Sequence, residues 1–173
     1  MTPNHPTGGV ALITGGGGGI GGATAERLAA NGVAVAIADF NFDNADDVRD
    51  RILAAGGAAC SIGLDVTDPG SVTAGVAEAQ ESLGPIDQLV NTAGTFQWAT
   101  MEDISDTDFE NMFRVHVFGM HSVCRAVIPG MVARSAGAVV NVTSIHAVRG
   151  QTLTAHYSAA TVQTQSPVPL ATN

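Results

Sequence analysis

Short apolar runs alternate along this chain with longer stretches in which apolar residues recur every three or four positions. The runs near 10–14, 33–38, 58–64, 86–90 and 137–143 have the length and composition of strands that are buried on both faces. The stretches between them have helical spacing. Strands that alternate with helices in this way predict an α/β fold with a parallel sheet.

Helix boundary signals divide the chain further. Asn31 and Gly32 end the first predicted helix, and two glycines end the second, which spans about 43–55. An aspartate followed by proline, a good first helical residue, predicts a third helix over 68–83. A capping pattern opens a long helix that is predicted over 105–132.

The glycine cluster after the first strand is the most informative stretch. An apolar strand leads through Thr14 into the glycines, and a helical pattern begins near Ile20. Glycines allow backbone angles that are closed to other residues, and without a Cβ their N–H groups can approach a phosphate. The helix dipole adds roughly half a positive charge. A flexible linker is the alternative, but the strand before the cluster and the helix face behind it favour an anion site.

Asp39 ends the second predicted strand and stands 18 residues after Gly21. This is close to the spacing at which a carboxylate accepts hydrogen bonds from the adenosine ribose of a dinucleotide. A carboxylate also repels a 2′-phosphate, and no arginine lies in the glycine cluster or beside Asp39. The pattern therefore favours NAD over NADP as cofactor. An ordinary solvated loop acid is the alternative.

Three motifs together resemble the short-chain dehydrogenase/reductase family over residues 10–160. The turn at 91–94 is similar to the family's NNAG motif, with threonine for the second asparagine. Tyr157 follows Ser144 by 13 residues, the separation at which the family places its catalytic serine and tyrosine. The first motif is similar to the family's TGxxxGIG loop, with its fixed positions at Thr14, Gly15, Gly19, Ile20 and Gly21.

The resemblance implies a fold and a cofactor site. The fold is a doubly wound, Rossmann-type parallel sheet in the order 3-2-1-4-5, without the family's C-terminal strands and helices. Asp65 and Val66 are implied to hold the adenine ring, although a bare helix cap would also explain them. Asn91, Ala93 and Gly94 are implied to pass beneath the cofactor, with a plain turn as the alternative.

The resemblance also implies hydride transfer between NAD(H) and a secondary alcohol or ketone. Tyr157 is the implied general acid and base, and Ser144 the implied hydrogen-bond donor to the substrate oxygen. His116 stands where the family usually has asparagine, at the position that links the site to solvent through water. The alternative for His116 is packing against core methionines, because Met112 and Met120 share its helical spacing.

The resemblance breaks after Tyr157. The family pattern is YxxxK, but Thr161 stands at the lysine position, and none of the seven basic residues in the chain is a lysine. That lysine binds the nicotinamide ribose and supplies a positive charge that favours the ionised phenol. Threonine supplies no charge. A catalytically impaired nucleotide-binding fragment or pseudoenzyme is therefore the alternative to an active dehydrogenase.

The helical and strand patterns also end here. Residues 161–173 are uncharged and contain two prolines, so we expect an irregular tail after a dinucleotide-binding domain of residues 1–160. An early end or a shifted reading frame after Ala160 would explain this change. A genuine terminus with loss of catalysis is the alternative.

Composition and net charge narrow the classes of partner that the protein is expected to bind. The 173 residues carry a net charge of −9, which disfavours nucleic acid and anionic membrane surfaces. Cys60 and Cys124 lack metal-ligand spacing, so we expect no metal site. No secretory signal is recognisable, and every apolar run is expected to be too short to span a bilayer. These features predict a cytoplasmic protein. The family resemblance implies a small alcohol or ketone as substrate, and the helix near 105–132 is a candidate surface for homo-oligomers.

Overall fold

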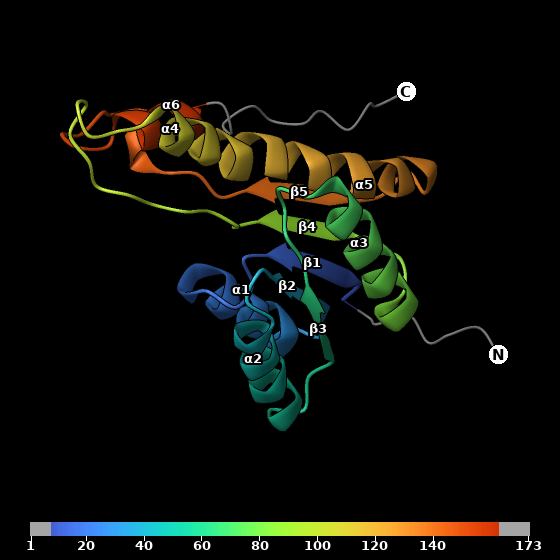
Figure 1. Ribbon diagram of the computed structural model, residues 1–173. Helices are drawn as coiled ribbons and strands as arrows, with labels where there is room; N and C mark the ends of the chain where they lie inside the picture. The colour runs from blue at the N-terminus through green and yellow to red at the C-terminus, as the bar shows by residue number, and fades with distance from the viewer. Residues whose placement is uncertain (1–7, 163–173) are drawn as a thin grey trace.

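The computed structural model describes residues 8–162, which form one parallel sheet with helices on both faces (Figure 1). In chain order the elements are β1 (Val10–Thr14), α1 (Gly19–Ala30), β2 (Ala34–Asp39), α2 (Phe42–Ala54), β3 (Ala59–Gly63), α3 (Pro69–Leu83), β4 (Gln88–Asn91), α4 (Asp106–Phe113), the π-helical segment η1 (Arg114–Gly119), α5 (Met120–Ala133), β5 (Ala138–Asn141), the short 3₁₀ turn η2 (Ile145–Ala147) and α6 (Ala155–Val162).

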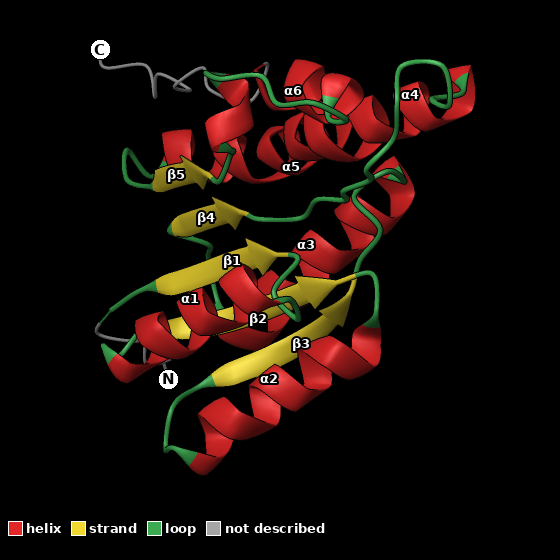
Figure 2. Cartoon of the chain, turned by 90° about the vertical axis from the view of Figure 1, so that its left-hand side faces the viewer, coloured by secondary structure: helices red, strands yellow, loops and turns green. Residues whose placement is uncertain are grey.

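The five strands are parallel and lie in the order β3-β2-β1-β4-β5, which confirms the predicted topology. Leu12 of β1, for example, is in register with Ala36 of β2 and Leu89 of β4. All five arrows point the same way in Figure 2, so their carboxyl ends share one edge of the sheet. β2 and β3 lie on one side of β1, and β4 and β5 lie on the other. The crevice between β1 and β4 is therefore the switch point at which such sheets bind ligands.

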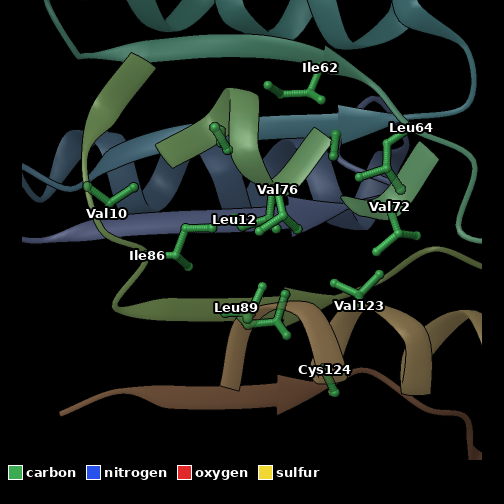
Figure 3. Close-up of a cluster of buried hydrophobic side chains, with 14 of the residues drawn as sticks. Val10, Leu12, Ile62, Leu64, Val72, Val76, Ile86, Leu89, Val123 and Cys124 are labelled. Carbon is green, nitrogen blue, oxygen red and sulfur yellow. The ribbon is translucent and has the colours of Figure 1, made fainter. Parts of the chain in front are cut away.

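Each face of the sheet has its own apolar core. On one face, Leu12 packs with α3 and α5 residues such as Val76 and Val123 (Figure 3). On the other face, Ile13 packs with α1 and α2 residues such as Val48. Both faces of β1 are covered, which is why its sequence is a continuous apolar run rather than an alternating pattern.

The helix signals act as predicted. The Asp68 side chain accepts a hydrogen bond from the backbone N–H of Gly70 at the start of α3. At the start of α4, Ser105 and Asp108 form a reciprocal capping box. The predicted helix over 105–132 is continuous, but it widens to a π-helical turn in η1 at 114–119. Single π-type turns inside α-helices are frequently found at functional sites.

One expectation about the long helix is wrong. Residues 106–133 form a continuous helical rod of 28 residues that is long and apolar enough to cross a membrane by length and composition. Polar residues such as Arg114 and Arg125 separate the apolar positions along the rod, so no single apolar run in the sequence has its length. Within the rod, Val123, Cys124, Val127 and Met131 are buried in the core formed with α3 and the sheet. That packing is typical of an outer-layer helix of an α/β protein.

The predicted start of the irregular tail is two residues too early. Helix α6 includes both Thr161 and Val162, because Thr161 is buried and continues the helix that bears Tyr157. The remainder of the predicted tail, 163–173, lies outside the described residues.

Candidate functional site

The glycine turn after β1 is sterically specified. Gly15 has a φ of +64°, and a Cβ there would lie 2.8 Å from the backbone of Ala93. A Cβ on Gly21 would lie only 2.2 Å from the carbonyl oxygen of Gly15. A Cβ on Gly19 would meet nothing within 4 Å, because Gly19 is exposed at the first turn of α1. The turn therefore packs β1, α1 and the 92–94 segment closely while leaving the helix N-terminus open.

Thr14 fixes the turn after β4 to the end of β1. Its backbone oxygen accepts hydrogen bonds from the backbone N–H of Thr92, at 3.2 Å, and from the Thr92 hydroxyl. The Thr14 hydroxyl oxygen accepts a hydrogen bond from the N–H of Ala93 at 3.3 Å. Threonine at 92 thus anchors this turn in a motif where the family has asparagine.

A cavity of about 680 Å³ opens at the carboxyl edge of the sheet. This volume is within the usual range for small-molecule sites. The charged side chains in its lining are Asp39 and Asp65, and no basic side chain is among the lining residues. The lining residues are Gly15, Gly18, Gly19, Ile20, Gly21, Asp39, Phe40, Leu64, Asp65, Val66, Thr67, Thr92, Ala93, Gly94, Thr95 and Val115.

Both carboxylates at this cavity are oriented by local hydrogen bonds. Asp39 accepts from the backbone N–H of Gly17 and from that of Asn41, each at 2.9 Å. Asp65 accepts from the backbone N–H and the hydroxyl of Thr67, at 2.8 and 2.7 Å. Each Asp39 oxygen keeps a second lone pair for a further donor, whereas Asp65 accepts both bonds at Oδ1 and has Oδ2 available for a further donor. The two side chains are therefore held in place at the cavity wall.

Two of the predicted cofactor-binding residues do not line the cavity. Thr14 is buried, and its hydrogen bonds with Thr92 and Ala93 hold the turn after β4 in place. Asn91 is also buried, and its amide nitrogen donates to Asn141 Oδ1 at 2.9 Å and to the sulfur of Cys124 at 3.5 Å. Asn91 therefore joins β4 to β5 and α5, and it supports the turn from within the sheet.

A smaller cavity of about 250 Å³ adjoins the first and contains Tyr157 and His116 in its lining. Five residues line both cavities: Ile20, Thr92, Ala93, Gly94 and Thr95. The residues from the three predicted motifs thus meet at one place, where the end of β1, the turn after β4 and helix α6 come together.

His116 is presented by the π-helical segment η1. Its ring lies against Gly94, where a Cβ would sit 2.7 Å from His116 Cε1, and its Nε2 is 2.8 Å from the carbonyl oxygen of Thr95. The His116 and Tyr157 rings meet edge to face, with centroids 5.4 Å apart. Burial lowers the pKa of His116. His116 therefore lines the cavity beside Tyr157, and its role in the site stays a prediction.

Two further aromatic residues contact Tyr157 and a third packs on one of them, and sequence reasoning missed all three. Phe96 meets the Tyr157 ring edge to face at 4.8 Å, and Trp98 meets Phe96 in the same way at 4.8 Å. His146 approaches Tyr157 from another side at 5.8 Å. The rings come from irregular segments after β4 and β5, where hydrophobic periodicity gives no signal.

Ser144 and Thr161 depart from the expected arrangement. Ser144 is not among the residues that line the cavity around Tyr157, and its Oγ accepts a hydrogen bond from the N–H of His146 at 3.2 Å. Thr161 does line that cavity, but its hydroxyl donates back to the Tyr157 carbonyl at 2.9 Å. In the described part of the chain, no charged side chain lines this cavity.

The fold and the cavities define a doubly wound, Rossmann-type α/β protein with a ligand-sized site at its switch point. The sequence model of the family described as short chain dehydrogenase matches residues 9–164. The chain therefore belongs to the short-chain dehydrogenase/reductase family, a family of oxidoreductases.

Similar proteins include two dehydrogenases of bacterial origin. Sorbitol dehydrogenase of Cereibacter sphaeroides is 39% identical over 150 residues, which cover 86% of this chain and 57% of that protein. The 2,5-dichloro-2,5-cyclohexadiene-1,4-diol dehydrogenase LinX of Sphingobium indicum is 39% identical over 142 residues, which cover 82% of this chain and 57% of that protein.

Solved structures of two further dehydrogenases have the same fold. NAD⁺-bound xylitol dehydrogenase superposes with a TM-score of 0.87 at 34% identity, over 90% of this chain and 60% of that one. A 7α-hydroxysteroid dehydrogenase complexed with NADH and 7-oxo glycochenodeoxycholic acid has a TM-score of 0.86 at 30% identity. The match covers 91% of this chain and 62% of that one. This chain thus spans less than two thirds of the length of each of these proteins.

Proposed function

We propose that the larger cavity binds NAD(H), and that the chain carries the nucleotide-binding and proton-transfer residues of an oxidoreductase for a secondary alcohol or ketone. The lining of the cavity is the observation that carries the proposal. A glycine cradle lies at the N-terminus of α1, and the only charged side chains in the lining are two carboxylates. Two of the similar structures hold NAD⁺ or NADH.

The residues present fit such a dinucleotide. The open first turn of α1 at Gly19 offers backbone N–H groups and a positive dipole end to the phosphates. Asp39 accepts hydrogen bonds from the ribose hydroxyls, and its charge repels a 2′-phosphate. Asp65 and Val66 border the adenine, and Ala93 and Gly94 lie beneath the nicotinamide end.

The nicotinamide, when bound, supplies or accepts the hydride. Tyr157 exchanges a proton with the substrate oxygen, because its phenol is the ionisable hydroxyl that lines the smaller cavity. The family resemblance gives Ser144 a hydrogen bond to the same oxygen, although Ser144 itself lies outside the lining of the smaller cavity in this structure. Its Oγ only accepts from the His146 N–H, so its own proton is available for this role. His116 adjoins the phenol ring and passes protons onward to solvent through water.

A second candidate function is nucleotide binding without efficient turnover, and Thr161 is the observation that favours it. Its hydroxyl is bonded to the backbone of its own helix, and it brings no positive charge to Tyr157. The two functions share the nucleotide site and differ only in the proton-transfer step.

Titration of the chain with NADH and with NADPH, followed by nucleotide fluorescence, tests the cofactor proposal. We expect NADH to bind about tenfold or more tightly than NADPH, a difference of about 1.4 kcal/mol. Equal affinities, or tighter NADPH binding, would contradict the role of Asp39. Reduction of NAD⁺ by secondary alcohols then decides between the enzyme and the silent binder.

We also propose that the protein is cytoplasmic and does not bind nucleic acid. The net charge of −9 repels phosphate backbones, and sixteen acidic residues outnumber seven arginines. Homo-oligomers through the rod at 106–133 are part of this proposal. The rod has exposed apolar side chains at Phe118 and Val132, which a second copy could cover.

A further inference from the structure

The cavity around Tyr157 is bordered by aromatic rings, and we infer that it selects a compact apolar ring. The substrate class is then an alicyclic or aromatic secondary alcohol, or the corresponding ketone, rather than an open-chain polyol. This inference rests on the proposed function, because it assigns the substrate of that same site.

The first argument is the aromatic border. Phe96 lines the cavity together with Tyr157 and contacts the Tyr157 ring, so a ligand that reaches Tyr157 here also meets Phe96. Trp98 continues the border by packing edge to face on Phe96. The two side chains remain 43% and 55% exposed. An apolar ring that covers them gains from the removal of apolar surface from water and from edge-to-face contacts.

The second argument is the shortage of free donors in the lining. Of the four threonine hydroxyls in the lining, those of Thr92, Thr143 and Thr161 donate to the backbone carbonyls of Thr14, Thr161 and Tyr157 respectively. The Thr95 hydroxyl and the Tyr157 phenol are the side-chain donors that the described lining leaves for a ligand. The His116 Nε2 is paired with the backbone of Thr95. A polyol would lose the hydration of several hydroxyl groups here and would find few partners in return, which is unfavourable. A molecule with one oxygen needs only the partners that the catalytic hydroxyls supply.

The third argument is size. The cavity measures about 250 Å³, which is below the usual range for drug-sized ligands. Residues that line it, such as Thr92 and Gly94, also line the larger cavity that is proposed for the nucleotide. A single ring beside the nicotinamide end is therefore the natural occupant.

The test uses the full chain and two probe ketones, cyclohexanone and fructose. Trp98 is the only tryptophan in the sequence, so its emission reports binding at this border without labelling. Each ketone is titrated with and without saturating NADH, and calorimetry measures the affinities independently. We expect cyclohexanone to bind about tenfold more tightly than fructose and to change the Trp98 emission.

Matched variants locate the binding. Phe96→Ala is expected to weaken cyclohexanone binding about fivefold while NADH affinity stays within about twofold. Phe42→Ala removes another exposed phenylalanine, outside both cavities, and is expected to leave both affinities unchanged. A circular-dichroism melt of each variant establishes that it is folded.

The outcomes separate this inference from the proposed function. Failure of NADH to bind refutes the proposed function, and the titrations without NADH still decide the ring preference. Fructose binding as tight as that of cyclohexanone overturns the inference, as does unchanged cyclohexanone affinity in Phe96→Ala. A wild-type chain that self-associates through this border, and becomes monomeric in Phe96→Ala without any change in ketone binding, also overturns it.

Discussion

Replacing Thr161 with lysine is expected to raise the rate of alcohol oxidation, because it places a positive charge one helical turn from Tyr157. Thr161 lines the cavity of about 250 Å³, so a longer side chain has space to extend toward the phenol. An ammonium group within about 4–6 Å favours ionised acids. General acid–base catalysis is typically worth about 10²- to 10⁴-fold in rate, and we expect a gain of about 10²-fold or more at pH 7.

The substitution also has a structural cost. Thr161 is 2% exposed, and its hydroxyl donates to the carbonyl oxygens of Tyr157 and Ser158 at 2.9 and 3.2 Å. Both carbonyls belong to the same helix as Thr161. Loss of the two hydrogen bonds from the hydroxyl therefore leaves these oxygens close to the N–H groups of their own helix. We expect Thr161→Lys to destabilise the fold by about 1 kcal/mol, which a thermal melt measures.

The assay follows NAD⁺ reduction with cyclohexanol from neutral to alkaline pH. Thr161→Met is the matched control, since methionine is a long, unbranched side chain without the charge. A wild-type chain that already turns over at ordinary dehydrogenase rates would refute this reasoning. Equal rates in the lysine and methionine variants would also refute it.

Four further expectations follow from the site and the sheet edge. Asp39→Ala should weaken NADH binding by about 1–2 kcal/mol in a fluorescence titration, and an unchanged Kd would rule out its ribose contact. Gly21→Ala should lower the melting temperature because its Cβ would sit 2.2 Å from the Gly15 carbonyl, whereas Gly19→Ala, with open space, should keep the melting temperature and lose NADH affinity. Equal melting temperatures in the two variants would contradict the packing argument. Burial lowers the pKa of His116, so its contribution to stability is complete above about pH 6.5 and is lost as pH falls through the lower folded value. Wild type should therefore lose more melting temperature on acidification than His116→Gln, and parallel losses would show that another group titrates. Val140 is 53% exposed on the edge strand β5, so size-exclusion chromatography should show self-association that Val140→Lys reduces. A monodisperse wild-type monomer would contradict this.

The sequence allowed the prediction of the sheet because its strands are buried on both faces. All five residues of β1 are buried, so its sequence is an apolar run with clear ends. Helix α3 was found with equal accuracy, since Asp68 and Pro69 mark its start by capping chemistry that is local in sequence. The strand order came from the resemblance to a family, and hydrophobic periodicity alone does not specify it.

The parts that escaped prediction depend on contacts between distant segments. The aromatic cluster joins Phe96 to Tyr157, which lie 61 residues apart in sequence, and no periodic pattern records such a contact. The η1 segment likewise keeps ordinary helical composition, so its wider turn gives no sequence signal. Asn91 was identified by its motif, but its buried bond to Asn141 depends on the pairing of β4 with β5.

The two halves of the proposed function draw on different parts of the sheet. The two carboxylates of the nucleotide cavity come from the end of β2 and the segment after β3, and its glycines come from the segments after β1 and β4. Tyr157 and Thr161 come from α6, after β5. The departure from the family pattern at Thr161 lies wholly in the second group. Nucleotide affinity and turnover should therefore respond independently to substitution, with Asp39→Ala changing the first and Thr161→Lys mainly the second. A loss of NADH binding in every variant that alters turnover would show that the two groups act as one unit.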